Sequence, residues 1–216
     1  MRILIENLGG KVSGEGLNPK DLEIIALYSQ DPELSQEEVA KRLSLSQPSV
    51  ALKVKRLRSQ GLLAVKTGLN ASKAGLHLAK VDVTATNASK ILKMFHGCPY
   101  FLNGFITSGE NNLCLIFAAE NIATLESIVD NHLRADQTVQ HVEFNIIIEA
   151  AHPLILPLKR VLKSHTPPCG TLKQCEKCPS YREGGCLGCP VMGRYDGWLW
   201  PTKTNPPHRA TEETSS

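Results

Sequence analysis

The N-terminal fold is decided by one stretch, residues 45–62, which reads LSQPSVALKVKRLRSQGL. Within it Val50, Val54 and Leu57 follow at steps of four and three residues, which places them on one side of a helix. A polar start that includes a proline favours a helix N-terminus near Ser46, and Gly61 is a natural terminator. The stretch therefore predicts a helix with an apolar inner stripe and a basic outer face.

Two shorter helices are expected before this one. An N-cap asparagine, a proline and an acid predict a helix over residues 18–29. Ser35 and Glu38 form a capping box, which predicts a second helix ending near Leu43. A short strand is expected over residues 62–65 as the beginning of a wing. Three helices with a short second turn are typical of a winged helix-turn-helix.

From residue 77 the hydrophobic period changes, which predicts a second domain. The expected order is a strand over 78–84, a helix over 87–96, strands over 101–107 and 113–119, a helix over 121–133 and a strand over 139–148. This β-α-β-β-α-β order is the ferredoxin-like arrangement, so the predicted fold class is α+β.

The 216 residues, 42% of them hydrophobic, can form two compact domains and an appendage. We expect a winged helix-turn-helix over 1–68, a ferredoxin-like dimerisation or effector domain over 69–153, a small irregular cysteine-rich tail over 154–204 and a disordered end over 205–216.

The net charge is only +3, but the charges are unevenly spread. Residues 39–81 hold nine Lys or Arg and no Asp or Glu, whereas acids outnumber bases over 82–152. A basic face is usually a solvated surface, but here it lies on the second helix of a helix-turn-helix, which favours double-stranded DNA as a partner. Contacts to phosphates are expected from Lys53, Lys55, Arg56 and Arg58, and contacts to phosphates or base edges from Ser46, Gln47 and Ser49.

Five of the seven cysteines form the pattern Cys169-x5-Cys175-x2-Cys178-x7-Cys186-x2-Cys189. Two C-x-x-C pairs at close spacing predict a metal site held by four of the five, since five unliganded thiols would be prone to oxidation.

Two kinds of metal site remain open. A tetrathiolate zinc site needs only four ligands and would stabilise a small module. A four-iron, four-sulfur [4Fe-4S] cluster is favoured, because both C-x-x-C pairs end in Cys-Pro and a fifth cysteine, Cys169, can compete for one ligand position. Cys98 and Cys114 are expected to pack as small hydrophobes, and no histidine is expected to be a ligand. Trp198 and Trp200 are expected to cover the metal site or to pack the tail onto the body.

Other function classes find little support in the sequence. The N-terminus lacks a signal peptide and no apolar run approaches the roughly 20 residues of a membrane helix, so no membrane partner and a cytoplasmic location are expected. No Gly-rich phosphate loop or nucleophile elbow is present, so we expect no catalytic residues and no enzyme activity.

The element order and the stretch 45–62 resemble the Lrp/AsnC family of feast/famine regulators over about residues 17–153. The resemblance implies that the first domain binds DNA and that the second forms homodimers or higher homo-oligomers and can sense amino acids. That family usually has arginine where Lys53 stands. Its effector loop corresponds to Gly109, Glu110, Asn111 and Asn112, in which Asn112 replaces an acid, so a small-molecule effector is uncertain.

The tail has no counterpart in ordinary members of that family. We therefore expect a transcription regulator whose DNA affinity is modulated by the iron-sulfur site, with redox state, oxygen or iron supply as the input. Two alternatives stay open: a regulator with a purely structural zinc site, and an iron-sulfur redox protein that uses the helix-turn-helix as an interaction surface.

Overall fold

The structure is a computed structural model that describes residues 17–158, 169 and 175–200. The chain divides into two compact units, the first ending at Lys66 and the second beginning at Thr67. None of the described helices is long and apolar enough to cross a membrane.

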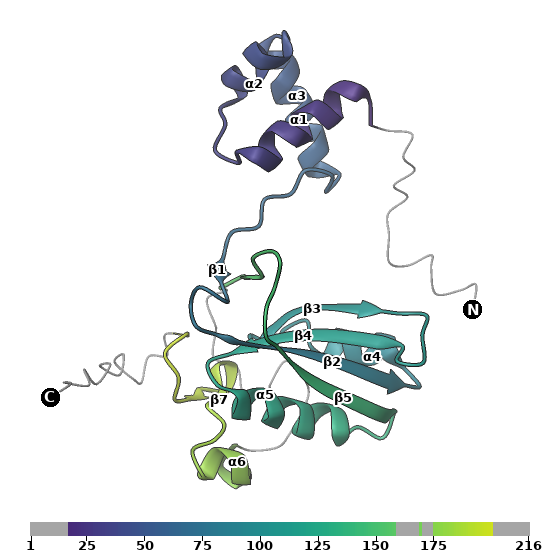
Figure 1. The fold of residues 1–216 in the computed structure, drawn as a ribbon, viewed down its shortest axis with the longest axis vertical. Coiled ribbons are helices and arrows are strands. Elements are labelled where there is room, and N and C mark those ends of the chain that lie inside the picture. Colours follow the sequence, from purple (N-terminus) through teal and green to yellow (C-terminus); the bar gives the residue numbers. More distant parts are fainter. Residues whose placement is uncertain (1–16, 159–168, 170–174, 201–216) are drawn as a thin grey trace, which may run out of the picture. The chain divides into compact units, whose positions relative to one another are not determined.

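The first unit is built from three helices, which are the purple and blue ribbons of Figure 1. They are α1 (Pro19–Gln30), α2 (Gln36–Leu43) and α3 (Gln47–Ser59). Each helix begins at a capping side chain, from Asn18, Ser35 and Ser46, that accepts a hydrogen bond from a backbone N–H of the first turn. Their inner faces share one core, which includes Ile24, Val39, Val50, Val54 and Leu57. The predicted tri-helical arrangement is confirmed.

The predicted strand over residues 62–65 is wrong. Leu63 is buried in the core of the first unit, but residues 64–67 form no regular element. A strand needs a partner for its backbone groups, and the described part of the first unit contains no other strand. Strand β1 (Leu69–Asn70) instead begins the second unit and pairs antiparallel with β6 (Ile155–Leu156).

The second unit is centred on a four-stranded antiparallel sheet of order β3-β4-β2-β5 (Figure 1). Its strands are β2 (His77–Ala85), β3 (Phe101–Ile106), β4 (Leu113–Ala119) and β5 (Val139–Ile147). In the central pairings Val81 lies opposite Leu115 on one side and Phe144 on the other. The predicted ferredoxin-like β-α-β-β-α-β domain is confirmed.

Helices α4 (Ala88–Met94) and α5 (Ile122–Val129) bury their apolar residues in the same core as the strands. Phe95, just after α4, packs edge-to-face against Phe117 with ring centroids 5.0 Å apart. The chain continues from α5 into a π-helical turn, η2 (Asp130–Arg134), where sequence analysis predicts an unbroken helix. Single π-turns inside helices are frequent at functional sites.

The described part of the tail folds onto this domain as a series of short elements. They are η3 (Cys175–Lys177), α6 (Pro179–Arg182), β7 (Gly188–Cys189), η4 (Pro190–Met192) and β8 (Arg194–Tyr195), and β7 pairs antiparallel with β8. Tyr195, Leu199 and Trp200 belong to the core of the second unit. The tail is therefore part of that unit, while the expected disordered end lies outside the described residues.

Hydrogen bonds from several elements fix the tail in place. The Tyr195 hydroxyl donates to the Glu120 carboxylate and accepts from the backbone N–H of Leu199 at 2.7 Å. Three further hydrogen bonds anchor the segment that contains the second C-x-x-C pair, residues 185–189. They run from Leu187 N–H to Thr124 Oγ1 at 2.9 Å, from Asn121 Nδ2 to the Gly185 carbonyl at 3.2 Å, and from the Tyr100 hydroxyl to the Gly188 carbonyl at 2.7 Å. The partners in the domain lie in the turn between β4 and α5, in α5 and in the turn before β3, so the sheet domain shapes the tail.

We predict that Trp200→Ala destabilises the second unit by about 3–5 kcal/mol, the usual cost of removing a buried tryptophan. Trp200 is 3% exposed and packs edge-to-face on Tyr100, with ring centroids 4.8 Å apart. Trp198 is 54% exposed, so Trp198→Ala is the matched control and should change stability by no more than about 0.5 kcal/mol. Chemical denaturation of both variants checks this, and equal effects would contradict the anchoring role of Trp200.

Candidate functional site

The outer face of α3 is the first candidate site. Ser46 caps the helix, accepting from Ser49 N–H at 3.4 Å, and Gln47, Ser49 and Lys55 are exposed. Leu52 is 71% exposed in the middle of this polar face. The outer face of α3 thus combines exposed polar side chains at its N-terminus, one exposed apolar side chain and the exposed Lys55. Such a combination suits a groove of nucleic acid.

Two of the predicted phosphate-binding residues also have partners inside the protein. Asp21 on α1 is completely buried, and its carboxylate accepts hydrogen bonds from Lys53 Nζ at 3.2 Å and from the Arg56 guanidinium. It also accepts from the backbone N–H of Asn18 at 3.0 Å as part of a capping box. Lys53 and Arg56 thus tie α3 to α1, and Arg58 lies 6.0 Å from the ring of Tyr28.

The ionic contacts hold Asp21 in its charged form. Burial by itself raises the pKa of this carboxyl, but the hydrogen bonds from Asn18, Arg56 and Lys53 outweigh burial and hold the pKa below its usual range. A carboxylate whose pKa falls on folding stabilises the fold above its unfolded-state pKa, and that stabilisation disappears as the pH falls through the folded-state pKa.

We predict that Asp21→Asn lowers the stability of the first unit by about 2 kcal/mol at pH 7, because two cations lose their buried partner. The difference from the unaltered chain should shrink as the pH falls below about 4, the pKa of an unfolded-state aspartate, towards the lower pKa that Asp21 has in the folded chain. Thermal unfolding followed over pH 3–7 measures this. A difference that stays constant over that range would contradict the charged role of Asp21.

The predicted effector loop is held by the sheet. Asn112 forms a two-way contact with the backbone of Ala85 at the end of β2, donating from Nδ2 at 2.7 Å and accepting at Oδ1 at 3.0 Å. The Glu110 carbonyl accepts from Thr84 Oγ1 at 3.0 Å, and Gly109 has open space around its Cα. The polar groups of Asn112 are thus engaged in closing the β2–β4 end of the sheet.

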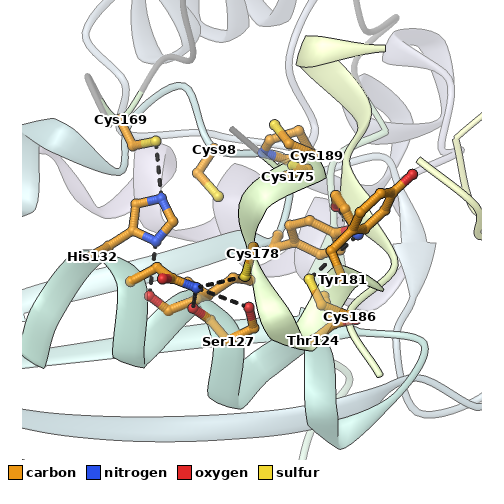
Figure 2. A pocket seen from close by; sticks show the side chains of 15 residues that line it. Cys98, Thr124, Ser127, His132, Cys169, Cys175, Cys178, Tyr181, Cys186 and Cys189 are labelled. Atoms are coloured by element: carbon orange, nitrogen blue, oxygen red, sulfur yellow. Dashed lines mark hydrogen bonds between the residues drawn. The ribbon is translucent and has the colours of Figure 1, made fainter. Parts of the chain in front are cut away.

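The second candidate site is a cavity of about 100 Å³ in the second unit, which we call the cysteine cavity. All five tail cysteines line it: Cys169, Cys175, Cys178, Cys186 and Cys189. Cys98, from the turn between α4 and β3, lines it as well, and so does His132 (Figure 2). A water molecule occupies about 10–15 Å³ of such volume, so the cavity has room for a group of several atoms.

The thiols of the cysteine cavity lie in unlike surroundings. Burial raises the pKa of Cys98 to about 12 and also raises the pKa values of Cys175 and Cys189. Burial acts in the same direction on Cys178, but hydrogen bonds from the backbone N–H of Tyr181 and from the Asn131 side chain outweigh it and lower the pKa. Of these four thiols, Cys178 is therefore the one whose pKa the surroundings lower, and a bound cation would lower the pKa of the others as well.

The π-helical turn η2 contributes the polar wall of the cavity (Figure 2). Asn131 Nδ2 lies 3.7 Å from Cys178 Sγ and donates to the Ser127 carbonyl at 2.9 Å. His132 Nδ1 donates to the Ile128 carbonyl at 2.9 Å, which directs Nε2 at Cys169 Sγ, 3.1 Å away. In metal sites, a hydrogen bond from one ring nitrogen of a histidine commonly orients the other ring nitrogen. Here the oriented nitrogen, Nε2, faces the sulfur of Cys169.

Sequence analysis did not place Cys98 and His132 beside the tail cysteines, although both line the cysteine cavity. Within the described ranges, no three His, Cys, Asp or Glu side chains form a group that could hold a single metal ion. One signal for Cys98 was present in the sequence: it is followed by Pro99, as Cys178 is by Pro179 and Cys189 by Pro190. His132 carries no comparable signal, because it reaches the cavity only through the π-turn.

Comparisons with known proteins bear on both folded units. Residues 17–73 match the family model described as winged helix-turn-helix DNA-binding. HTH-type transcriptional regulator LrpC of Bacillus subtilis is 29% identical over 135 residues, covering 61% of this chain and 94% of that protein. The leucine-responsive regulatory protein of Rhizobium meliloti is 26% identical over 139 residues, covering 61% of this chain and 89% of that protein.

Solved structures show the same fold. Escherichia coli AsnC superposes with a TM-score of 0.56 at 13% identity, covering 63% of this chain and 95% of that one. Bacillus subtilis LrpC superposes with a TM-score of 0.53 at 24% identity, covering 63% and 97%. The described part of the chain therefore shares its fold with AsnC and LrpC. These proteins are covered almost completely, while more than a third of this chain lies outside each alignment.

Proposed function

We propose that this chain is a sequence-specific DNA-binding transcription regulator, active as a homodimer or higher homo-oligomer, whose DNA affinity depends on a [4Fe-4S] cluster in the cysteine cavity. The DNA-binding part rests on the α3 face and on the similarity to regulators of the Lrp/AsnC type. The cluster part rests on one observation, the convergence of six thiols on one cavity.

The DNA interface is assigned to the exposed residues of α3. Ser46, Gln47 and Ser49, exposed at the start of α3, are assigned contacts to phosphates or base edges, and Lys55 supplies a positive charge. Leu52 is apolar and 71% exposed, which suits contact with a thymine methyl group in the major groove. Lys53 and Arg56 keep α3 in position through Asp21 and supply positive charge from the flank.

We predict that Lys55→Ala weakens DNA binding at every sequence and lowers the slope of log K against log salt by about 1 for each bound α3, because each loses one phosphate contact. Lys90→Ala is the control, since Lys90 is an exposed residue of the ferredoxin-like domain that lies near Asp136. Fluorescence anisotropy with the chain's own operator fragment, repeated over a series of salt concentrations, measures both. An unchanged slope for Lys55→Ala would exclude this residue from the interface.

A cluster is favoured over a single zinc ion by the size and lining of the cavity. About 100 Å³ exceeds the space of one ion in direct contact with its ligands, whereas a [4Fe-4S] core has eight atoms. Backbone and side-chain N–H groups already point at several sulfurs, including Gly188 N–H at 3.4 Å from Cys186 Sγ. Such donors stabilise thiolate ligands and tune the cluster.

The β1–β6 pairing offers a route from the tail to the DNA-binding unit. β1 follows the segment that leaves the first unit, and β6 precedes the tail, with Leu69 opposite Leu156. The contact at its edge is close: a Cβ on Gly68 would lie 2.4 Å from the Leu156 carbonyl oxygen. We infer that a change in the tail reaches the DNA-binding unit through this pairing.

The deciding experiment compares DNA affinity with and without the cluster. We expect anaerobic removal of iron by a chelator to change the Kd for the operator by about tenfold, a typical allosteric coupling. The double variant Cys175→Ser/Cys178→Ser should bind DNA like the iron-free chain, whether or not iron is supplied. A folded double variant that has lost iron but keeps the affinity and salt slope of the loaded chain would exclude modulation by the cluster.

A second variant tests the proposed route. Gly68→Ala should keep its iron, because Gly68 does not line the cysteine cavity, but should lose most of the difference in DNA affinity between the loaded and iron-free states. Gly109→Ala is the matched control, since the nearest atom to its added Cβ is 3.9 Å away. If Gly68→Ala keeps the full difference, the β1–β6 pair is not the route.

A further inference from the structure

Three cysteines of the second unit sit in turns of the same construction. Each is followed by proline, in Cys98-Pro99, Cys178-Pro179 and Cys189-Pro190. In each turn the backbone N–H groups two and three residues after the cysteine hydrogen-bond its sulfur, and they belong to Tyr100 and Phe101, to Ser180 and Tyr181, and to Val191 and Met192.

The proline explains why the three turns are alike. It has a fixed φ and no N–H, so it turns the chain without offering a donor, and the next two N–H groups can point back at the sulfur. Two N–H donors aimed at one sulfur stabilise negative charge on it. Cys98 therefore has the same local arrangement of donors as two cysteines of the C-x-x-C pairs.

Cys98 also lies where a ligand is needed. It comes from the turn between α4 and β3, yet it lines the cysteine cavity together with the tail thiols (Figure 2). The thiols that interact with it electrostatically are Cys189 and Cys169, both in the tail.

The other cysteine outside the tail provides the contrast. Cys114 lies on β4, paired with Asp82 of β2 and Phe105 of β3, and it does not line the cysteine cavity. No proline follows it. Cys98 and Cys114, which sequence analysis treats alike, are therefore in different environments.

We propose that Cys98 is a thiolate ligand of the cluster, so that the ferredoxin-like domain supplies one ligand and the tail supplies the rest. This inference rests on the proposed cluster. Cys178 and Cys189, in the matching Cys-Pro turns, are two of the tail ligands, and the last comes from Cys169, Cys175 or Cys186. A cluster held in this way cross-links the α4–β3 turn to the tail.

The test compares Cys98→Ala with Cys114→Ala after anaerobic purification. We expect the unaltered chain and Cys114→Ala to carry the same iron and sulfide, and Cys98→Ala to lose most of both while its circular dichroism and oligomeric state are unchanged. If Cys98→Ala keeps the iron content and visible spectrum of the unaltered chain, the proposal is overturned, and Cys98 is a packing residue.

A measurement on the unaltered chain covers the case in which Cys98→Ala does not fold. A crystal structure of the iron-loaded protein with anomalous data at the iron edge shows directly which sulfurs are bonded to iron. Iron bonded to Cys98 Sγ supports the proposal, and a cluster bonded to four tail sulfurs overturns it while leaving the proposed function intact. An unaltered chain that binds no iron overturns the cluster itself, which distinguishes the two failures.

Discussion

The packing of the tail against the ferredoxin-like domain is the interaction on which the cysteine cavity depends. Trp200 packs edge-to-face on Tyr100 and Tyr195, with ring centroids 4.8 and 5.5 Å away. The tail is too poor in apolar residues to form a core alone. Its apolar residues instead pack into the core of the sheet domain. Without that packing the cysteines would be distributed along an irregular segment, and no enclosed space would exist between them.

The ferredoxin-like domain also contributes residues to the lining of the cysteine cavity. Its α5 helix opens into a π-turn that directs Asn131 and His132 at sulfur atoms of the tail, and its α4–β3 turn carries Cys98. A site built from two parts of the chain responds to changes in either one. This construction connects the proposed metal site in the tail to the ferredoxin-like domain.

The sequence predicts most of the fold because its signals are local. Capping residues at Asn18, Ser35 and Ser46 define the three helices, and strand alternation defines the sheet. The strand over residues 62–65 fails because strand formation depends on a partner, which local sequence does not reveal. The pairing of Asp21 with Lys53 and Arg56 joins residues more than 30 positions apart. The sequence therefore predicts the basic residues of the third helix but not their acidic partner on the first.

The proposed metal site could also be predicted only in part. The two C-x-x-C pairs are a local pattern and predict the tail cysteines, whereas Cys98 and His132 reach the cavity only through the tertiary fold. The central claim is that this cavity holds a [4Fe-4S] cluster. Anaerobic purification followed by a visible spectrum and by iron, sulfide and zinc analysis tests it most directly. The account predicts a brown protein with about four irons and four sulfides per chain. A colourless protein with one zinc per chain would contradict it.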